Sequence, residues 1–99
     1  MSLKIYLTEA AENDLAEIIP WYEKQKQGLG EHFLISFESC IASIERNPLQ
    51  FRSRYHGYRR VNFSRFPYAV YYKALTDKVE IRGVFHQRRS VYRELRKRK

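Results

Sequence analysis

The spacing of apolar residues changes near Asn47-Pro48, and this change constrains the fold more than any other feature of the sequence. Before that point, apolar residues recur every three or four positions, which is the spacing of one face of an α-helix. After it, they fall in short runs rich in β-branched and aromatic residues, which are typical of strands. The sequence therefore predicts a helical half followed by a sheet-forming half.

A first helix is expected to follow Thr8, which is a suitable N-cap residue. Its apolar face consists of Ala11, Leu15, Ile18 and Tyr22. Pro20 lies inside this pattern and lacks a backbone N–H, so we expect a kink or a break near Ala16–Pro20. Gly28 is expected to end the helix.

A second helix is predicted from about Gly30 to Arg46. Its apolar stripe comprises Phe33, Phe37, Ile41 and Ile44, with Leu34 and Cys40 beside it. Proline disfavours helical geometry in the residue before it, so Asn47-Pro48 should terminate the helix. The short glycine-containing link makes the two helices an antiparallel hairpin.

Strands are predicted on both sides of the hairpin. They span Leu3–Leu7, Tyr58–Phe63, Tyr68–Leu75 and Val79–Phe85. The short link Thr76–Lys78 makes the last two an antiparallel pair. The predicted fold class is α+β: an N-terminal strand, a helical hairpin and three antiparallel strands, with the helices packed on one face of the sheet. A chain of 99 residues is expected to form a single domain, 1–99, with a basic tail over about 90–99.

Composition narrows the class of protein further. The single cysteine, Cys40, excludes an intramolecular disulfide and is most simply a small core residue. No apolar run approaches the roughly 20 residues of a membrane span, and the N-terminal residues lack a signal-peptide pattern. We therefore expect a soluble cytoplasmic protein that needs no cofactor.

Charge is distributed unevenly along the chain. Residues 1–50 contain 4 Lys/Arg and 8 Asp/Glu, a balance of −4, whereas residues 51–99 contain 15 and 3, a balance of +12. An asymmetry of this size predicts that the second half carries a positive surface, whose partners are polyanions or an acidic protein.

Several kinds of site find no support in the sequence. The histidines, His32, His56 and His86, have no Cys or His partner at metal-ligand spacing, so no metal site is expected. There is no glycine-rich phosphate loop and no nucleophile elbow. The acidic residues of the first helix are expected to form a solvated face; they are Glu9, Glu12, Asp14 and Glu17.

The residues that remain as site candidates are basic and aromatic. They are Arg52, Arg54, Tyr58, Arg59, Arg60, Arg65, Tyr68, His86, Arg88, Arg89 and Tyr92. Arginine binds phosphate or carboxylate in bidentate fashion, tyrosine stacks on bases, and histidine moves protons near neutral pH. Such a set suits a metal-free ribonuclease, a passive nucleic-acid binder or a dock for an acidic partner. Arg59 and Arg60 should point to opposite faces of a strand, so only one of them can join a given surface.

Three stretches of the sequence together resemble a known family. They are TEAAENDLAEIIPWYEKQKQGLGEHF, ERNPLQF and YRRVNFSRFPYAVYYKALTDKVEIRGVFHQRRS. They are similar to the first helix with its Gly-Leu-Gly turn, the exit from the second helix, and the sheet of the RelE/ParE toxin superfamily. These are the toxins of type II toxin–antitoxin, or plasmid stabilisation, systems, and the resemblance runs from about Leu3 to Arg89.

The resemblance implies a growth-arresting toxin, a cognate acidic antitoxin, and one of two targets. RelE-like members cleave messenger RNA at the ribosome without a metal, whereas ParE-like members poison DNA gyrase and are not nucleases. The Phe66-Pro67-Tyr68 and His86…Arg88-Arg89 features favour the ParE-like branch. A non-catalytic nucleic-acid-binding module and a degenerate toxin remain open alternatives.

Only part of the RelE nuclease pattern is present in this chain. Arg59, Arg88 and Tyr92 fit catalytic positions, and His86 is a further candidate. Tyr68 and Val61 stand where that pattern has basic residues. The residues expected to bind the target or the antitoxin are Arg60, Arg65, Tyr68, Arg88 and Arg89. As structural alternatives, Tyr68 is a cross-strand aromatic, and His86 ends its strand with a hydrogen bond to neighbouring backbone.

The C-terminal segment Ser90–Lys99 is expected to form a short helix. Val91 and Leu95, at positions i and i+4, are its only apolar contacts. We expect Leu95 to anchor this segment weakly, and the final residues to be mobile in the absence of a partner.

Overall fold

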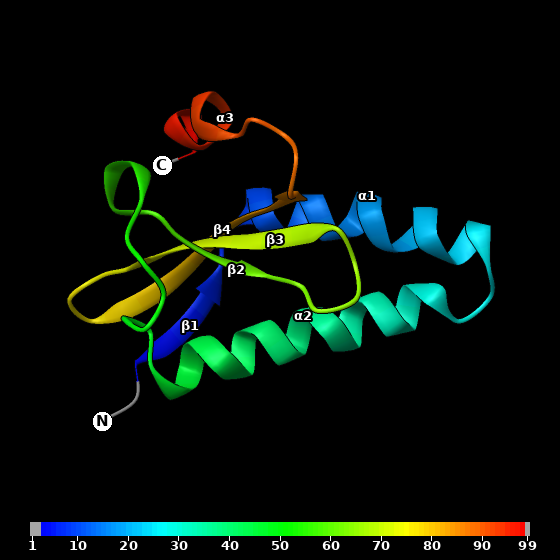
Figure 1. Cartoon of the computed structure of the whole chain (residues 1–99), viewed down its shortest axis with the longest axis horizontal. Coiled ribbons are helices and arrows are strands. Elements are labelled where there is room, and N and C mark those ends of the chain that lie inside the picture. Colours follow the sequence, from blue (N-terminus) through cyan, green and yellow to red (C-terminus); the bar gives the residue numbers. More distant parts are fainter. Residues whose placement is uncertain (1–2, 99) are drawn as a thin grey trace.

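The computed structural model of the chain describes residues 3–98 (Figure 1). Its elements are β1 (Lys4–Leu7), α1 (Glu9–Gln25), α2 (Leu29–Arg46), the 3₁₀ turn η1 (Tyr55–Gly57), β2 (Arg59–Asn62), β3 (Tyr68–Ala74), β4 (Lys78–His86) and α3 (Tyr92–Lys97). The Lys99 end of the predicted mobile tail lies outside the described residues. No helix within 3–98 combines the length and apolar character that a bilayer span requires.

The four strands form one sheet in the order β1-β4-β3-β2. β2, β3 and β4 pair antiparallel, and β1 pairs parallel to β4 with Ile5 opposite Val79. The helices α1 and α2 cover one side of the sheet, here called the inner face, and α3 lies on the other side, the outer face (Figure 1). The predicted α+β class and its order of elements are confirmed.

The helical hairpin begins and turns at residues with a clear local role. The Thr8 hydroxyl accepts a hydrogen bond from the Ala11 N–H at 3.2 Å, which confirms the predicted N-cap. The helix continues through Pro20 to Gln25, so of the two predicted alternatives, a kink or a break, the break does not occur. A proline removes the donor of only one intrahelical hydrogen bond. Tyr22, two residues after Pro20, still packs against the larger core.

The turn between α1 and α2 is held by one carboxylate. Glu23 accepts hydrogen bonds from the N–H groups of Gly28 and Gly30 at 3.0 Å. Gly28 has a φ of +93°, a conformation that favours glycine, and it caps the start of α2. Gly30, the predicted start of the second helix, lies inside α2, and a Cβ atom there would lie 3.1 Å from the Ile19 carbonyl oxygen. Its lack of a side chain therefore lets the two helices approach closely.

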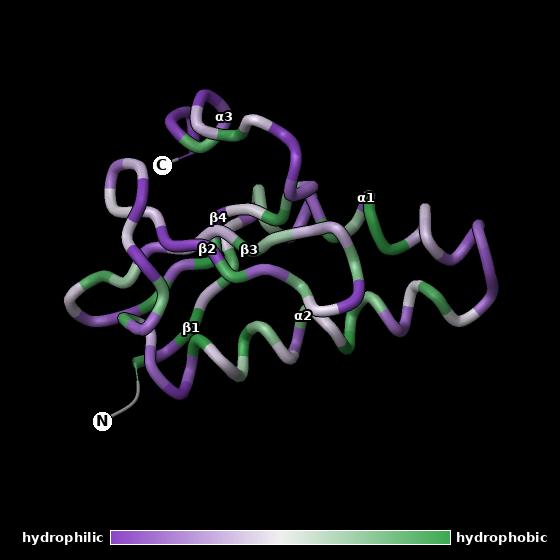
Figure 2. The backbone as a smooth tube through the Cα atoms, viewed as in Figure 1, coloured by the Kyte–Doolittle hydropathy of each residue, from purple (hydrophilic) through white to green (hydrophobic). Residues whose placement is uncertain are grey.

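The larger hydrophobic core lies between the hairpin and the inner face. It contains Phe33, Phe37, Cys40 and Ile44 of α2, which confirms most of the predicted stripe and the role of Cys40 as a core residue. Tyr72 and Ile81 meet these side chains from the sheet and are fully buried. Figure 2 shows apolar residues concentrated along these elements, with hydrophilic residues along the segment that leads into α3.

A second, smaller core anchors α3 to the outer face. It consists of Tyr58, Ala69, Tyr71, Phe85, Val91 and Leu95. Val91 and Leu95 are each 1% exposed, so the expectation that Leu95 anchors the segment weakly is wrong. Tyr58, predicted as the start of a strand, precedes β2 instead and donates its hydroxyl to the Leu95 carbonyl at 3.2 Å.

An ion pair joins the first helix, α1, to Arg98, the residue that follows α3. The Asp14 carboxylate of α1 accepts from both terminal nitrogens of Arg98, at 2.6 and 3.0 Å, and from the Val84 N–H at 2.9 Å. The predicted solvated acidic face is correct for Glu9, Glu12 and Glu17, which are exposed, but wrong for Asp14. Asp14 lies where α1, β4 and the residue after α3 meet, so its carboxylate binds other residues of the chain rather than solvent.

Candidate functional site

Two arginines and two tyrosines come together on the outer face beside α3. This outer cluster comprises Arg54, Arg60, Tyr71 and Tyr92. The Arg60 guanidinium lies 5.7 Å from the centroid of the Tyr71 ring. The ring of Tyr92, at the start of α3, lies 4.7 Å from that of Tyr55 with the two planes tilted by 44°. Strand alternation explains the position of Tyr71, because Val70 and Tyr72 on either side of it point into the inner core.

The outer cluster sets the protonation state of Tyr71. Burial raises the pKa of its hydroxyl and the Tyr92 hydroxyl adds to this, while the cations of Arg60 and Arg54 oppose it. Because the net shift is upward, Tyr71 is protonated at neutral pH and can donate a hydrogen bond. Tyr71 is only 3% exposed, so a phosphate or carboxylate bound here would contact the guanidinium groups of Arg54 and Arg60 rather than the phenol.

Arg60 belongs to this cluster, whereas Arg59 does not. Arg60 donates to the Asn62 side-chain oxygen at 2.9 Å and to the Gln87 carbonyl at 3.4 Å. Arg59 pairs with Tyr72 across the strands and donates to the Phe51 carbonyl at 2.5 Å on the inner side. The predicted opposite orientation of Arg59 and Arg60 is confirmed.

Arg59 and Tyr72 fasten the loop that follows α2. Arg59 also reaches the Leu49 carbonyl at 3.4 Å, and the Tyr72 hydroxyl donates to the Pro48 carbonyl at 2.6 Å. Burial raises the pKa of Tyr72 to about 12, with Arg59 opposing the shift, so Tyr72 remains a donor throughout the physiological range. The predicted catalytic residues Arg59 and Tyr92 consequently lie on opposite faces of the sheet.

The end of β4 carries the remaining predicted residues. His86 Nδ1 accepts from the Arg88 N–H at 3.2 Å, which matches the expected hydrogen bond to neighbouring backbone. Arg88 is exposed, and Arg89 lies over the Phe85 ring at 5.0 Å. His86 and Arg89 line a small hollow together with Asp14 and Glu17 of α1, which mixes both signs of charge.

Tyr68 connects this region to the inner core. Its ring meets His86 at 5.5 Å and Phe33 at 5.4 Å, both edge to face. Burial raises the pKa of the Tyr68 hydroxyl. Tyr68 is therefore a cross-strand aromatic, as the structural alternative predicted.

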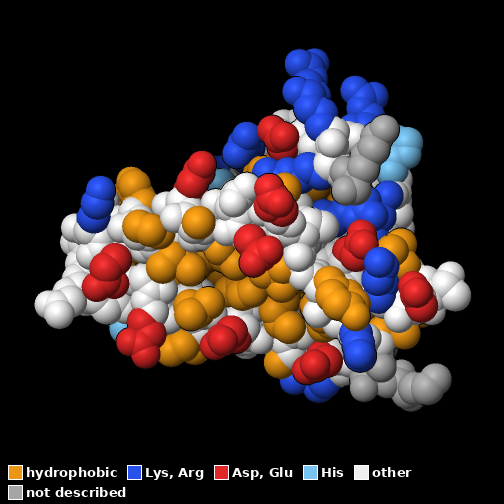
Figure 3. Space-filling model, turned by 180° about the vertical axis from the view of Figure 1, so that it is seen from behind, with side chains coloured by type: hydrophobic (Ala, Val, Ile, Leu, Met, Phe, Trp, Pro, Cys, Tyr) orange, Lys and Arg blue, Asp and Glu red, His pale blue; other side chains and the backbone are white. Residues whose placement is uncertain are grey.

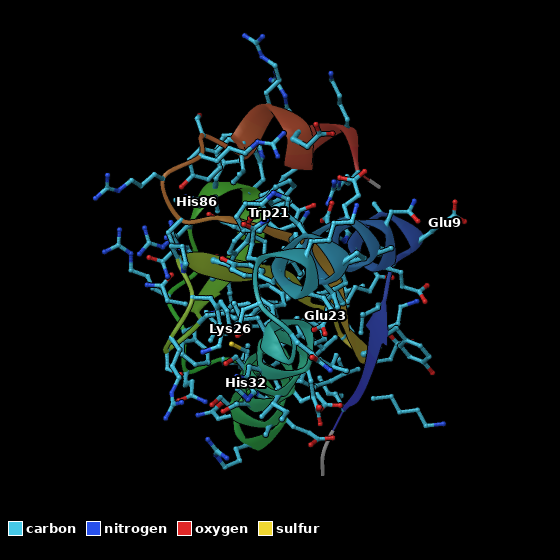
Figure 4. All side chains as sticks on the ribbon, turned by 90° about the vertical axis from the view of Figure 1, so that its right-hand side faces the viewer. Glu9, Trp21, Glu23, Lys26, His32 and His86 are labelled. Atoms are coloured by element: carbon cyan, nitrogen blue, oxygen red, sulfur yellow. The ribbon has the colours of Figure 1, made fainter. Side chains whose placement is uncertain are left out.

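In Figure 4, His86 lies on the same side of the molecule as Trp21, whose side chain is exposed near the end of α1.

Arg65 lies apart from the other predicted residues. It belongs to the exposed loop between β2 and β3 and lines a groove along α2 with Ile35 and His32. The structure therefore places Arg60 and Tyr92 in one cluster around Tyr71. Arg88 and Arg89 lie at the turn before α3. Arg59 and Arg65 lie apart from these two groups. Sequence reasoning missed Tyr71 and Tyr55; the alternation of Val70, Tyr71 and Tyr72 along β3 was the signal that pointed to Tyr71.

The charge asymmetry of the sequence is also an asymmetry in space. In the rear view, acidic side chains surround apolar ones over the body of the molecule, and Lys and Arg side chains gather around α3 (Figure 3). Within residues 3–98, no three His, Cys, Asp or Glu side chains converge in the way that a metal ion requires.

The comparisons with known proteins agree with this architecture. The model of the family described as "ParE toxin of type II toxin-antitoxin system, parDE" matches residues 5–91. A solved structure of the chromosomal ParDE toxin–antitoxin system from P. aeruginosa superposes with a TM-score of 0.75 at 15% identity, covering 85% of this chain and 95% of that chain. No curated protein sequence matches the chain. The family match spans most of the sequence, and the chain belongs to the ParE toxin family of type II toxin–antitoxin systems.

Proposed function

We propose that this toxin arrests growth by poisoning DNA gyrase and that an acidic segment of its antitoxin neutralises it. The observation that carries the choice of target is the position of Arg59, whose guanidinium binds the Phe51 carbonyl on the inner side. A RelE-like nuclease built on Arg59, Arg88 and Tyr92 would need these side chains around one phosphate, and Tyr92 belongs to the opposite face. The membership in the ParE family supports gyrase as the target.

The family implies an antitoxin partner, and the charge of this chain supports an acidic one. Residues 51–99 carry a balance of +12, and a group of Lys and Arg side chains gathers around α3 on the face shown in Figure 3. An acidic segment that orders on this surface would gain charge-assisted hydrogen bonds to arginine and would be drawn to it by long-range attraction. By covering the cations, it would deny the target access to them.

A reconstituted assay tests the proposed target. The purified toxin is added to DNA gyrase with plasmid DNA, and in parallel to ribosomes translating a defined messenger RNA. Gyrase poisoning predicts loss of supercoiling and accumulation of cleaved DNA, with intact messenger RNA. Messenger RNA cleavage with normal supercoiling would contradict the proposal. The double charge reversal Arg88→Glu/Arg89→Glu should weaken the inhibition about tenfold or more, since two exposed cations are lost.

A matched control separates the site from general charge. Lys24→Glu/Lys26→Glu makes the same change in net charge on exposed residues of the hairpin, and Figure 4 shows Lys26 near the turn between α1 and α2, away from α3. It should leave the inhibition of gyrase within about twofold of the unmodified toxin. Equal losses in both variants would mean that only the net charge of the toxin matters, and Arg88 and Arg89 would not form a contact surface.

The outer cluster supports a second candidate function, metal-free cleavage of messenger RNA. Arg54 and Arg60 could stabilise a phosphorane, and the exposed Tyr92 could donate a proton, whereas Tyr71 is buried and would act only by supporting Arg60. On this alternative, Arg60→Gln or Tyr92→Phe abolishes cleavage, whereas Arg59→Gln retains it. Binding of RNA or DNA that weakens steeply with salt, without any toxicity, would instead indicate a passive nucleic-acid-binding module.

A further inference from the structure

A basic pocket opens on the outer face beneath α3, next to the outer cluster. It has a volume of about 310 Å³ and is lined by Tyr55, His56, Tyr58, Lys73, Arg82 and Arg96, with Leu95 and Arg98 of α3 completing the wall. Figure 1 shows the segment before β2 rising beside α3, and the contact between Tyr55 and Tyr92 joins the two. The volume is at the lower end of the range for small-molecule sites.

The lining of this pocket contains no acidic side chain. Arg82 is paired with Glu80 at 2.7 Å, and Arg98 with Asp14 at 2.6 Å. Lys73 and Arg96 form no ion pair with any other residue of 3–98. The Lys73 ammonium lies 4.7 Å from the centroid of the Tyr58 ring, and this contact favours its position in the lining of the pocket. Glu80 lies opposite Lys73 in the β3–β4 register, but its carboxylate pairs with Lys78 and Arg82. Two cations without an ion-pair partner among residues 3–98 thus line one open pocket.

The backbone at the rim adds a second observation. His56 has φ +49° and ψ +40°, a left-handed conformation that residues with a side chain rarely adopt, and Gly57 follows with φ +80°. The ring of His56 meets that of Tyr55 edge to face at 4.1 Å. Residues held in such sparsely populated conformations cluster at active sites and ligand-binding segments. Here the conformation occurs in the segment that contributes Tyr55 and His56 to the lining of the basic pocket.

We propose that the basic pocket binds one nucleotide unit, with its phosphate on Lys73 and Arg96 and its base against Tyr55. Guanidinium and ammonium groups bind phosphate, and tyrosine rings accept bases by stacking. The unit can be a free mononucleotide or one nucleotide of a single strand, because both present the same phosphate and base. The proposal is separate from the choice of gyrase as the target, since it concerns binding by the isolated chain.

The test titrates the full chain, at one fixed salt concentration, with adenosine 5′-monophosphate, inorganic phosphate and a short single-stranded oligodeoxyadenylate. The readout is the backbone amide chemical shifts. We expect saturable shifts at Tyr58, Lys73 and Arg82. Adenosine monophosphate should bind at least about tenfold more tightly than phosphate, because it adds stacking to the ionic contact. Saturation by the oligonucleotide but not by adenosine monophosphate would show that the pocket binds a nucleotide only as part of a single strand. Saturation by both ligands would show that it binds a nucleotide whether free or within a strand.

Two variants and one control make the test decisive. Arg96→Gln, and Lys73→Met, which keeps the alkyl stem over Tyr58, should each weaken binding about tenfold. Arg93→Gln removes the same charge from an exposed position of α3 that does not line the pocket, and should change affinity less than about twofold. Equal loss in Arg93→Gln and Arg96→Gln, equal affinity for phosphate and the nucleotide, or an absence of saturation would each overturn the proposal.

Discussion

At the scale of single residues, Asp14 connects more of the molecule than any other charged side chain described above. Its two oxygens receive three hydrogen bonds, two from Arg98 and one from the Val84 N–H. The side chains of Asp14 and Arg98 are 15% and 16% exposed, so water competes poorly for either. Charge-assisted hydrogen bonds in such surroundings contribute more than surface ion pairs do.

Asp14→Asn should lower the free energy of unfolding by about 2 kcal/mol, because Arg98 loses its counter-ion while it stays mostly buried. Urea denaturation measures the loss. The control Glu17→Gln, one turn further along α1 and exposed, should change the free energy by less than about 0.5 kcal/mol. A similar small loss in Asp14→Asn would show that the pair contributes little to stability.

Glu23 should make the stability of the helical hairpin depend on pH. Hydrogen bonds from the Gly28 and Gly30 N–H groups hold the pKa of this carboxylate below its ordinary value. A lowered pKa in the folded state contributes stability above the unfolded value, about 4.3, and that contribution is lost as pH falls through the folded value. The melting temperature of Glu23→Gln should lie below that of the unmodified chain at pH 7.

The same comparison repeated at successively lower pH serves as the control. As the pH falls through the lowered pKa of Glu23, the carboxylate takes up a proton and comes to resemble glutamine, so the two melting temperatures should converge. A gap that stays constant as the pH falls through that pKa would mean that the carboxylate charge has no part in holding the turn between α1 and α2.

At the scale of elements, α3 is the segment whose attachment depends most on distant residues. Tyr58 donates to the Leu95 carbonyl and accepts from Arg82 at 3.5 Å. A Cβ atom at Gly83 would lie 2.9 Å from the Arg98 guanidinium, so the glycine lets α3 pack close to β4. Six helical residues are too few to be stable in isolation, and the packing therefore decides whether they are ordered.

Tyr58→Phe should loosen α3 without unfolding the sheet. Loss of the hydroxyl removes the hydrogen bond to Leu95 and should cost about 1 kcal/mol, which corresponds to roughly fivefold faster amide exchange within α3. Hydrogen exchange measures this residue by residue. Tyr72, whose hydroxyl binds the Pro48 carbonyl on the inner side, provides the matched control, because Tyr72→Phe should leave exchange in α3 unchanged.

The elements that the sequence predicted well are those whose signal is local. Thr8, the stripe around Phe33 and Phe37, and the alternation along β3 each depend on residues a few positions apart. The attachment of α3 could not be predicted in this way. Its partners, Tyr58, Phe85 and Asp14, are far from Leu95 and Arg98 in the sequence, and no periodicity marks such a pairing. The same holds for the parallel pairing of β1 with β4.

For the candidate site, the sequence predicted that the functional residues are basic and aromatic, but it did not predict which of them lie together in the fold. It indicated that Arg59 and Arg60 separate, because neighbouring side chains of a strand alternate. It could not indicate whether Arg59 or Arg60 lies on the side of α3. The position of α3 depends on the smaller core on the outer face. Alternation along β3 indicated the face of Tyr71, but Tyr71 and Lys73 were missed as site residues because their neighbours on the outer face come from segments 54–60 and 91–98.

At the scale of the whole molecule, the cations around α3 should govern how quickly an acidic antitoxin segment associates. Attraction between exposed charges is screened by salt, so the association rate constant should fall about tenfold or more between 0.05 and 0.5 M salt. Stopped-flow mixing measures this rate. The slope should flatten in Arg88→Glu/Arg89→Glu and stay unchanged in Lys24→Glu/Lys26→Glu. A rate that does not depend on salt would show that apolar contacts alone guide the encounter.

The central claim is that this ParE-family toxin acts on DNA gyrase, and induction in bacteria tests it most directly. Incorporation of labelled thymidine and of labelled amino acids is followed in parallel over the first minutes. The account predicts that DNA synthesis falls first while protein synthesis continues. An early fall in protein synthesis with continuing DNA synthesis would contradict it, and would make Arg54, Arg60 and Tyr92 the first candidates for a ribonuclease site.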